Sequence, residues 1–236
     1  MEKVIAVLRR ADTDDEWCER QRGPVADALL ELGVPGLSVN VRDGAVRHSL
    51  MTITTLDPPV AAVVSLWTQQ CYGDQMRSAL KLLSTECEQL SAYLVTESVP
   101  LSAPAVESGS RTAGLANIAL LRRPASMDQA TWLTRWQDDH TAVAINTQST
   151  FEYTQNWVVR TMIPESAGIA GITAIVEEVF PMEAITDLKA FFGAADDDDL
   201  QDRLNRMVAS TAAFGANENI DTVPTSRYII RTPFGK

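Results

Sequence analysis

Histidine is the side chain that most readily transfers protons near neutral pH, and this chain of 236 residues contains only two, His48 and His140. Trp132 and Trp136 precede His140 at intervals of four residues, and Val143 follows it. At helical spacing these side chains share one face, so the imidazole lies beside two indoles. Two interpretations follow: a core histidine held by a hydrogen bond, or a general base whose pKa is tuned by an apolar pocket.

The next segment, residues 151–162, has the alternation of a strand and an unusual polarity on one face. The side chains on that face are Phe151, Tyr153, Gln155 and Trp157, and those on the opposite face include Glu152, Thr154 and Asn156. A phenol, an amide and an indole together indicate a cavity with a few orienting hydrogen bonds, as in small-molecule pockets. The alternative is that Tyr153 and Gln155 only reach the edge of the sheet.

Trp136, His140 and the Tyr-Thr-Gln-Asn run that starts at Tyr153 resemble the motif of the EthD-type family, which belongs to the dimeric α+β barrel superfamily. The resemblance covers residues 113–232, and the first half of the chain more faintly. It implies ferredoxin-like units that pair sheet to sheet. The superfamily includes muconolactone-type isomerases, polyketide cyclases and cofactor-free monooxygenases. By this resemblance, His140 would be the general base and Tyr153 its acid or orienting partner.

The sequence also departs from the family pattern. Members often read His-Ala-Pro-Leu, whereas this chain reads His-Thr-Ala-Val over 140–143. In the first half Arg22 takes the place of the histidine under one alignment and Val25 under another, and no tyrosine follows in Leu37–Val41. We therefore expect one candidate site, in the second half, and a degenerate, structural first half.

The elements that must position these residues are predicted from an internal repeat, in which similar segments recur in the same order 113 to 124 residues later. The matching pairs are Ile5–Arg10 with Ile118–Arg123, Ala61–Trp67 with Ala174–Phe180, and Val99–Pro100 with Val223–Pro224. Together these matches predict a tandem duplication of one structural unit.

Each half reads as β-α-β-β-α-β, the ferredoxin-like unit. In the first half we expect strands at 3–9, 37–42, 48–55 and 60–68, helices at 13–33 and 74–92, and a last strand. In the second half we expect strands at 115–121, 151–162 and 171–180, helices at 127–147 and 183–213, and a last strand. The Asp43-Gly44 pair predicts a hairpin. The second long helical stretch should be interrupted near Gly193.

The predicted fold class is α+β, with two ferredoxin-like halves packed sheet to sheet as an intramolecular dimeric α+β barrel. In a ferredoxin-like unit the helices cover one face of the sheet, and the opposite face must pack against a partner. In this chain we expect the sheet of the other half to be that partner. The predicted organisation is a first half at 1–101, a small and polar linker at 102–112, and a second half at 113–236.

Composition narrows the function classes. A net charge of −11 opposes binding to nucleic acid. No apolar stretch is long enough for a membrane span and no segment resembles a signal peptide, so we expect a cytoplasmic protein without a membrane partner.

The three cysteines lack metal-site spacing, and we expect no metal site and no cofactor. The acidic run at 196–199 indicates the start of a helix, with a cation site as the alternative.

The preferred functional hypothesis is a cofactor-independent isomerase, cyclase or lyase that acts on a small, mostly apolar, cyclic or aromatic molecule. In it His140 and Tyr153 are catalytic. The expected substrate-binding residues are Trp136, Gln155, Trp157 and Phe180. The alternatives are a non-catalytic binder of a hydrophobic ligand, a haem-handling protein and a cofactor-free monooxygenase. The chain is expected to be a monomeric pseudo-dimer or a homodimer.

Overall fold

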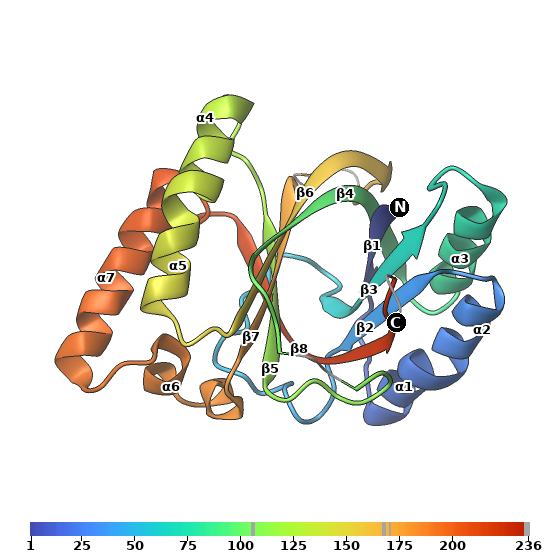
Figure 1. Ribbon diagram of the computed structural model, residues 1–236, viewed down its shortest axis with the longest axis horizontal. Coiled ribbons are helices and arrows are strands. Elements are labelled where there is room, and N and C mark those ends of the chain that lie inside the picture. The colour runs from blue at the N-terminus through green and yellow to red at the C-terminus, as the bar shows by residue number, and fades with distance from the viewer. Residues whose placement is uncertain (105–106, 167–168, 170, 234–236) are drawn as a thin grey trace.

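Eight strands close into one barrel in the computed structural model, which describes residues 1–104, 107–166, 169 and 171–233. The barrel lies between two groups of helices (Figure 1). The elements of the first half are β1 (Glu2–Arg9), α1 (Asp15–Arg20), η1 (Gln21–Val25), α2 (Ala26–Glu31), β2 (Gly36–Val41), β3 (Val60–Thr68), α3 (Asp74–Ser84) and β4 (Gln89–Leu101). Those of the second half are β5 (Leu115–Leu121), α4 (Gln129–Leu133), η2 (Thr134–His140), α5 (Thr141–Thr147), β6 (Glu152–Ile163), β7 (Ala174–Phe180), η3 (Met182–Ile185), α6 (Leu188–Phe192), α7 (Asp197–Ala213) and β8 (Ile220–Arg231).

The two halves contribute four strands each, in the same spatial order. Around the barrel the order is β1-β3-β2-β8-β5-β7-β6-β4, so the first half supplies β4-β1-β3-β2 and the second β8-β5-β7-β6. The halves join through two antiparallel pairs, β2 with β8 and β4 with β6. The α+β barrel predicted within one chain is therefore confirmed, while the duplication of the sequence stays a prediction.

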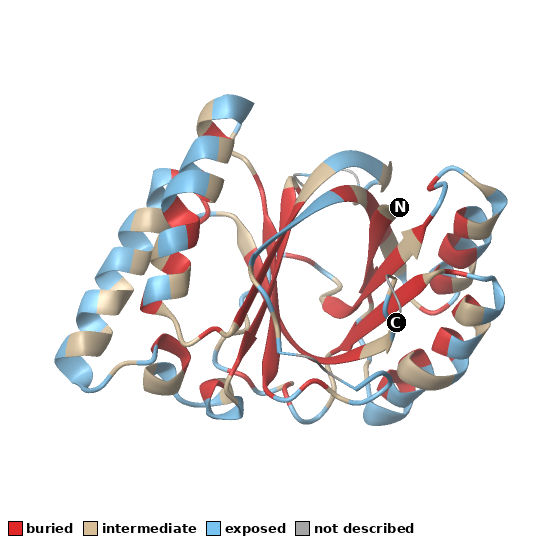
Figure 2. Cartoon of the chain, in the orientation of Figure 1, coloured by how far each residue is buried: buried red, intermediate tan, exposed pale blue. Residues whose placement is uncertain are grey.

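Successive side chains of a strand point to opposite faces, and here both faces are buried. Ile5, Val7, Ile118 and Ile175 belong to an apolar cluster inside the barrel. Their strand neighbours pack outward against helices, in one cluster under α1–α3 and another under α4–α7. Figure 2 shows the strands as buried along most of their length and the helices as exposed on their outer sides. As a result, β1, β3 and β5 are nearly continuous apolar runs.

The first helix of each half begins at an aspartate whose side chain caps it. The carboxylate of Asp14 accepts a hydrogen bond from the backbone of Trp17, and that of Asp128 from the backbone of Thr131. Both helices contain a π-helical segment, η1 and η2, near their middle. In η2 the hydroxyl of Thr141 donates to the carbonyl of Trp136, five residues earlier. Such wide turns occur mostly at functional sites.

Two predicted elements of the first half are wrong. Residues 48–55 form turns and one isolated bridge, Ile53 with Thr222, so Asp43-Gly44 does not start a hairpin. This segment crosses to the second half, where the backbone N–H of Leu50 donates to the carbonyl of Ile185. The predicted helix at 74–92 ends at Ser84 because Gln89 already belongs to β4, which pairs with β1.

The Val-Pro pairs are not structurally equivalent. Val223 lies opposite Ile118 of β5, but the residue opposite the matching Ile5 of β1 is Tyr93 rather than Val99. The described part of the predicted linker contacts the barrel. In its described part, Gly109 and Thr112 donate backbone hydrogen bonds to β8, so the segment runs along the barrel, and residues 105–106 lie outside the described residues.

The interruption near Gly193 is confirmed, because this residue ends α6 in the left-handed conformation, φ 62°. Asp196 then caps α7 by accepting from the backbone of Asp199, so the acidic run begins a helix as predicted. Within the described residues, no group of three His, Cys, Asp or Glu side chains is placed to hold a metal ion. Among those residues, no helix is long and apolar enough to cross a lipid bilayer.

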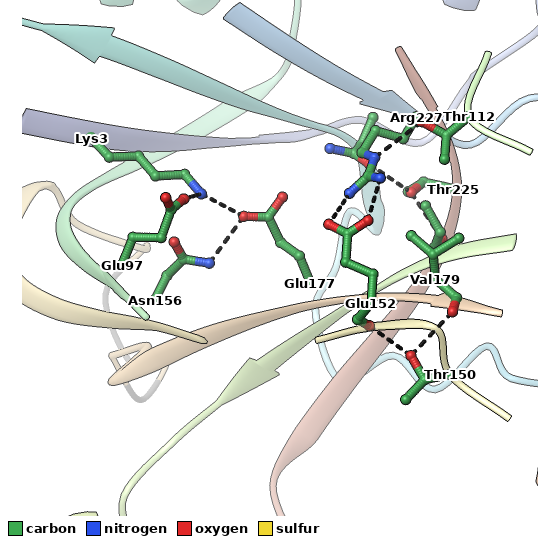
Figure 3. A network of polar contacts seen from close by, with 12 residues as sticks. Lys3, Glu97, Thr112, Thr150, Glu152, Asn156, Glu177, Val179, Thr225 and Arg227 are labelled. Carbon is green, nitrogen blue, oxygen red and sulfur yellow. Dashed lines mark hydrogen bonds and ion pairs between the residues drawn. The ribbon is translucent and has the colours of Figure 1, made fainter. Parts of the chain in front are cut away.

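Ion pairs occupy the polar end of the barrel interior (Figure 3). The ammonium of Lys3 lies 2.7 Å from Glu177 and 2.6 Å from Glu97, and Arg227 binds both oxygens of Glu152 at 2.5 Å. Burial raises the pKa of Glu177, but Lys3, together with Arg227 and Asn156, outweighs this effect and holds that pKa below its usual value. Lys3 of the first half therefore neutralises a buried carboxylate of the second.

Replacing Lys3 by Met should lower the free energy of unfolding by about 3 kcal/mol, because it leaves Glu177 buried without its counter-ion. Urea denaturation at neutral pH measures this difference. The control is Lys189→Met, which removes an exposed ion pair with Asp197 on the surface and should leave the free energy of unfolding nearly unchanged. Equal losses in the two variants would show that the buried pair does not stabilise the barrel.

Candidate functional site

A cavity of about 300 Å³ lies between the outer face of the second half's sheet and the helices that cover it. Its floor consists of side chains of β5, β7, β6 and β8, and its walls of side chains from η2, α6 and α7. Most of the lining is apolar and includes Ala119, Trp136, Val176, Phe191, Phe192 and Phe214. A pocket of this character suits a small apolar molecule.

The first half also contributes to this cavity. Met51 and Ile53, from the turn segment that was predicted to be a strand, lie along its wall. Ile53, Val208 of α7 and Asn217 line the cavity and are also exposed, so the cavity reaches solvent at these residues. The first half is therefore not only a structural partner of the second.

Three titratable side chains of the described residues line the cavity: His140, Tyr153 and Glu178. Each is buried, with exposures of 7%, 2% and 7%. No lysine or arginine is among the described lining residues. The cavity therefore brings together the two predicted catalytic residues and adds a carboxyl group.

The imidazole of His140 is held on one side by Ser210 of α7, whose hydroxyl lies 2.9 Å from Nδ1. Its ring lies 4.8 Å from that of Phe214, centroid to centroid. Burial lowers the pKa of His140 to about 4, so the imidazole is neutral at physiological pH. It can donate or accept one hydrogen bond in the cavity, but its basicity is low.

The phenol of Tyr153 remains protonated over the physiological range. Burial raises the pKa of Tyr153 far above its usual value, and the charge of the nearby Glu178 raises it further. A buried neutral phenol is a hydrogen-bond donor that favours negative charge developing on a bound molecule.

Glu178 is the titratable group best suited to proton transfer near neutral pH. Burial raises the pKa of its carboxyl to about 7, and a hydrogen bond with Asn117 limits the increase. In the sheet, Glu178 lies directly opposite Asn117 of β5 on one side and Tyr153 of β6 on the other. The three side chains form one row across the floor of the cavity.

Of the remaining predicted site residues, one lines the cavity and three do not. Trp136 lines the cavity, but Gln155 does not, and its amide donates instead to the hydroxyl of Thr141 at 2.7 Å. Trp157 is half-buried against the same apolar cluster without lining the cavity. Phe180 stacks on Phe191 at 4.1 Å between ring centroids, behind the cavity wall.

Three of the four residues predicted to share one face of the helix are buried. Trp132, Trp136 and His140 are buried, as expected, whereas Val143 is half-buried and Ala144 belongs to the core. The wide π-helical turn that ends at His140 shifts the buried face of the following residues by one position.

Sequence reasoning missed Glu178, although a signal was present. Glu177 and Glu178 are consecutive in an otherwise apolar strand. Because the side chains of a strand alternate, one of the two must face the helices whatever the register. The structure places Glu177 inside the barrel beside Lys3 and Glu178 in the cavity.

No protein-family model matches this sequence, and no curated protein matches it. Solved structures are similar in fold. An anthrone oxidase-like protein is 10% identical, with 99% of this chain and 95% of that chain covered and a TM-score of 0.51. A candidate monooxygenase from Lactobacillus acidophilus NCFM is 7% identical over 98% and 96% of the two chains, with a TM-score of 0.46. A mutant chlorite dismutase from Candidatus Nitrospira defluvii is 10% identical over 97% and 92%, with a TM-score of 0.48. The first of these likenesses supports the dimeric α+β barrel fold.

Replacing Glu178 by Gln should change how stability depends on pH. Because its folded pKa is raised, the contribution of Glu178 is fully present below its unfolded pKa of about 4.5 and is lost as pH rises through about 7. Relative to wild type, Glu178→Gln should therefore gain about 3 kcal/mol of unfolding free energy between about pH 4.5 and pH 8. Urea denaturation across this range measures the gain, and a pH-independent difference would contradict the raised pKa.

Proposed function

We propose that this protein binds a small, mostly apolar, cyclic or aromatic molecule in the cavity and catalyses proton transfer on it. The observation that carries this proposal is the apolar cavity of about 300 Å³ into which His140, Tyr153 and Glu178 all face. The class of reaction is isomerisation, cyclisation or a lyase step. No cofactor is required for chemistry of this kind, because the side chains of the cavity supply both an acceptor and donors of protons.

The size and polarity of the cavity support a compact ligand. Its volume lies at the lower end of the range for ligand pockets, about 300–1,000 Å³, which suits a molecule of one or two rings. The aromatic side chains of Trp136, Phe191, Phe192 and Phe214 offer edges and faces for a flat ring system.

The EthD resemblance supports placing the reaction at this site. Its motif residues Trp136, His140 and Tyr153 come from a helix and a strand, and all three line the same cavity. Membership of the EthD-type family remains part of this proposal. His140, neutral and oriented by Ser210, and Tyr153, a neutral phenol, can together orient an oxygen atom of the ligand and stabilise charge that develops on it.

A thermal-shift screen of aromatic ketones, lactones, quinones and haem tests binding. A compound that binds the folded state raises the unfolding midpoint in proportion to RT ln(1 + [L]/Kd). Ala119→Phe fills the floor of the cavity without removing a titratable group, so it should lose at least half of any shift seen with wild type. Val159→Phe places the same bulk on an exposed position of β6, away from the cavity, and should keep the full shift.

If every compound shifted wild type and Ala119→Phe equally, the ligand would bind elsewhere and the proposal would fail. Product analysis of a bound compound then distinguishes catalysis from binding alone, and an oxygen electrode distinguishes proton transfer from monooxygenation. We expect the compound to be converted with no consumption of oxygen. A converted compound that consumes oxygen would replace proton transfer by the monooxygenase alternative.

A further inference from the structure

The row of side chains across the cavity floor has an apolar counterpart in the first half. Asn117 of β5, Glu178 of β7 and Tyr153 of β6 lie opposite one another in the ladder. At the corresponding positions of β1, β3 and β2, the partners are Val4, Leu66 and Leu37.

These three apolar residues are fully buried under the helices of the first half. An apolar row is therefore compatible with this fold at these positions, and packing alone does not require an amide, a carboxyl and a phenol.

The carboxyl of Glu178 has no cation beside it, unlike the carboxylate of Glu177. Glu177 is paired with Lys3 inside the barrel, but among the described residues no lysine or arginine lines the cavity that Glu178 faces. Burying a carboxylate in this way is costly, and such an arrangement is typical of groups that exchange a proton during a reaction.

Resting on the function proposed above, we propose that Glu178 is the residue that takes the proton from the bound molecule, and that this molecule is an uncharged ketone with acidic hydrogens beside its carbonyl group. His140 then has a positioning role, because Ser210 holds its Nδ1. Tyr153 and Asn117 flank Glu178 in the sheet and line the same cavity, so either could donate a hydrogen bond to the carbonyl oxygen.

The chemistry of the proposed step needs no other reactant. A carboxylate oxygen of Glu178 forms a bond to the hydrogen, the carbon–hydrogen bond breaks, and its electron pair moves to the carbonyl oxygen to give an enolate. The phenol of Tyr153 stabilises the oxyanion by a hydrogen bond. Glu178 then returns the proton to the same carbon or to a conjugated one, and in the second case the product is an isomer.

The charges around the cavity favour an uncharged ligand. The titratable groups that face Glu178 are Tyr153 on β6 and His140 on η2, and both are neutral at physiological pH. Among the described lining residues a carboxylate or phosphate on the ligand would meet no lysine or arginine, and the carboxylate of Glu178 would repel it. The cavity should therefore bind an ionised acid more weakly than an uncharged ketone of the same shape.

The probe for the test is 2-tetralone, an apolar two-ring ketone with exchangeable hydrogens beside its carbonyl group. Proton NMR follows the replacement of these hydrogens in deuterated buffer at about pH 7.5. Wild type should accelerate exchange over buffer alone, and Glu178→Gln should lower this acceleration by about 100-fold or more, the usual effect of losing a general base. Thermal shifts should show that Glu178→Gln still binds the ketone.

Two further variants define the control and the alternative. Glu183→Gln removes an exposed carboxylate outside the cavity and should exchange at the wild-type rate. Glu178→Leu introduces the residue type of Leu66, which occupies the corresponding position of the first half. This variant should fold without accelerating exchange, and it replaces Glu178→Gln in the test if that variant does not fold.

Each outcome decides one of the two proposals. Exchange that survives in Glu178→Gln and Glu178→Leu but is lost in His140→Gln would overturn the role of Glu178 and leave the proposed function standing. If wild type bound 2-tetralone without accelerating exchange, the carbon-acid assignment would be overturned while ligand binding stood. Absence of both binding and exchange in wild type would overturn the proposed function together with this inference.

Discussion

The buried ion pair between Lys3 and Glu177 joins the two halves of the barrel, and the rest of the structure depends on this closure. Both faces of the strands are covered along most of their length once the barrel is closed, so each buried charge that points inward needs a partner within reach. Arg227 and Glu152 meet the same requirement beside them (Figure 3). The interior therefore combines an apolar cluster with buried charges that are paired, and the outer faces are left for the helices.

The alternation of β7 gives two neighbouring glutamates opposite properties. Glu177 points into the barrel, where Lys3 lowers the pKa of its carboxyl, and Glu178 points under the helices, where burial raises the pKa of its carboxyl to about 7. The same residue type thus serves stability on one face and, in our proposal, chemistry on the other. The difference comes entirely from whether a cation lies within reach of the carboxylate.

The two halves share one arrangement of strands and helices, but the space between the helices and the sheet is filled differently in each. Under α1–α3 the space between helix and sheet is filled by apolar side chains such as Leu37 and Leu66. Under α4–α7 the corresponding space contains a cavity, with Tyr153 and Glu178 in its floor. The first half nevertheless reaches this cavity, because the segment that carries Ile53 crosses the barrel to form part of its mouth.

The sequence by itself determined most of the order of elements and the helical stripe of Trp132, Trp136 and His140, because side-chain periodicity is a local property. The pairing of His140 with Tyr153 was implied by the EthD resemblance. The sequence did not determine the path of residues 48–55, since a short alternating run leaves its partner strand undecided. Nor did it assign Glu178, whose pKa depends on the absence of a lysine or arginine among the described residues around one cavity. Barrel closure decides which face of β7 meets Lys3, and closure arises only from contacts between residues far apart in the chain.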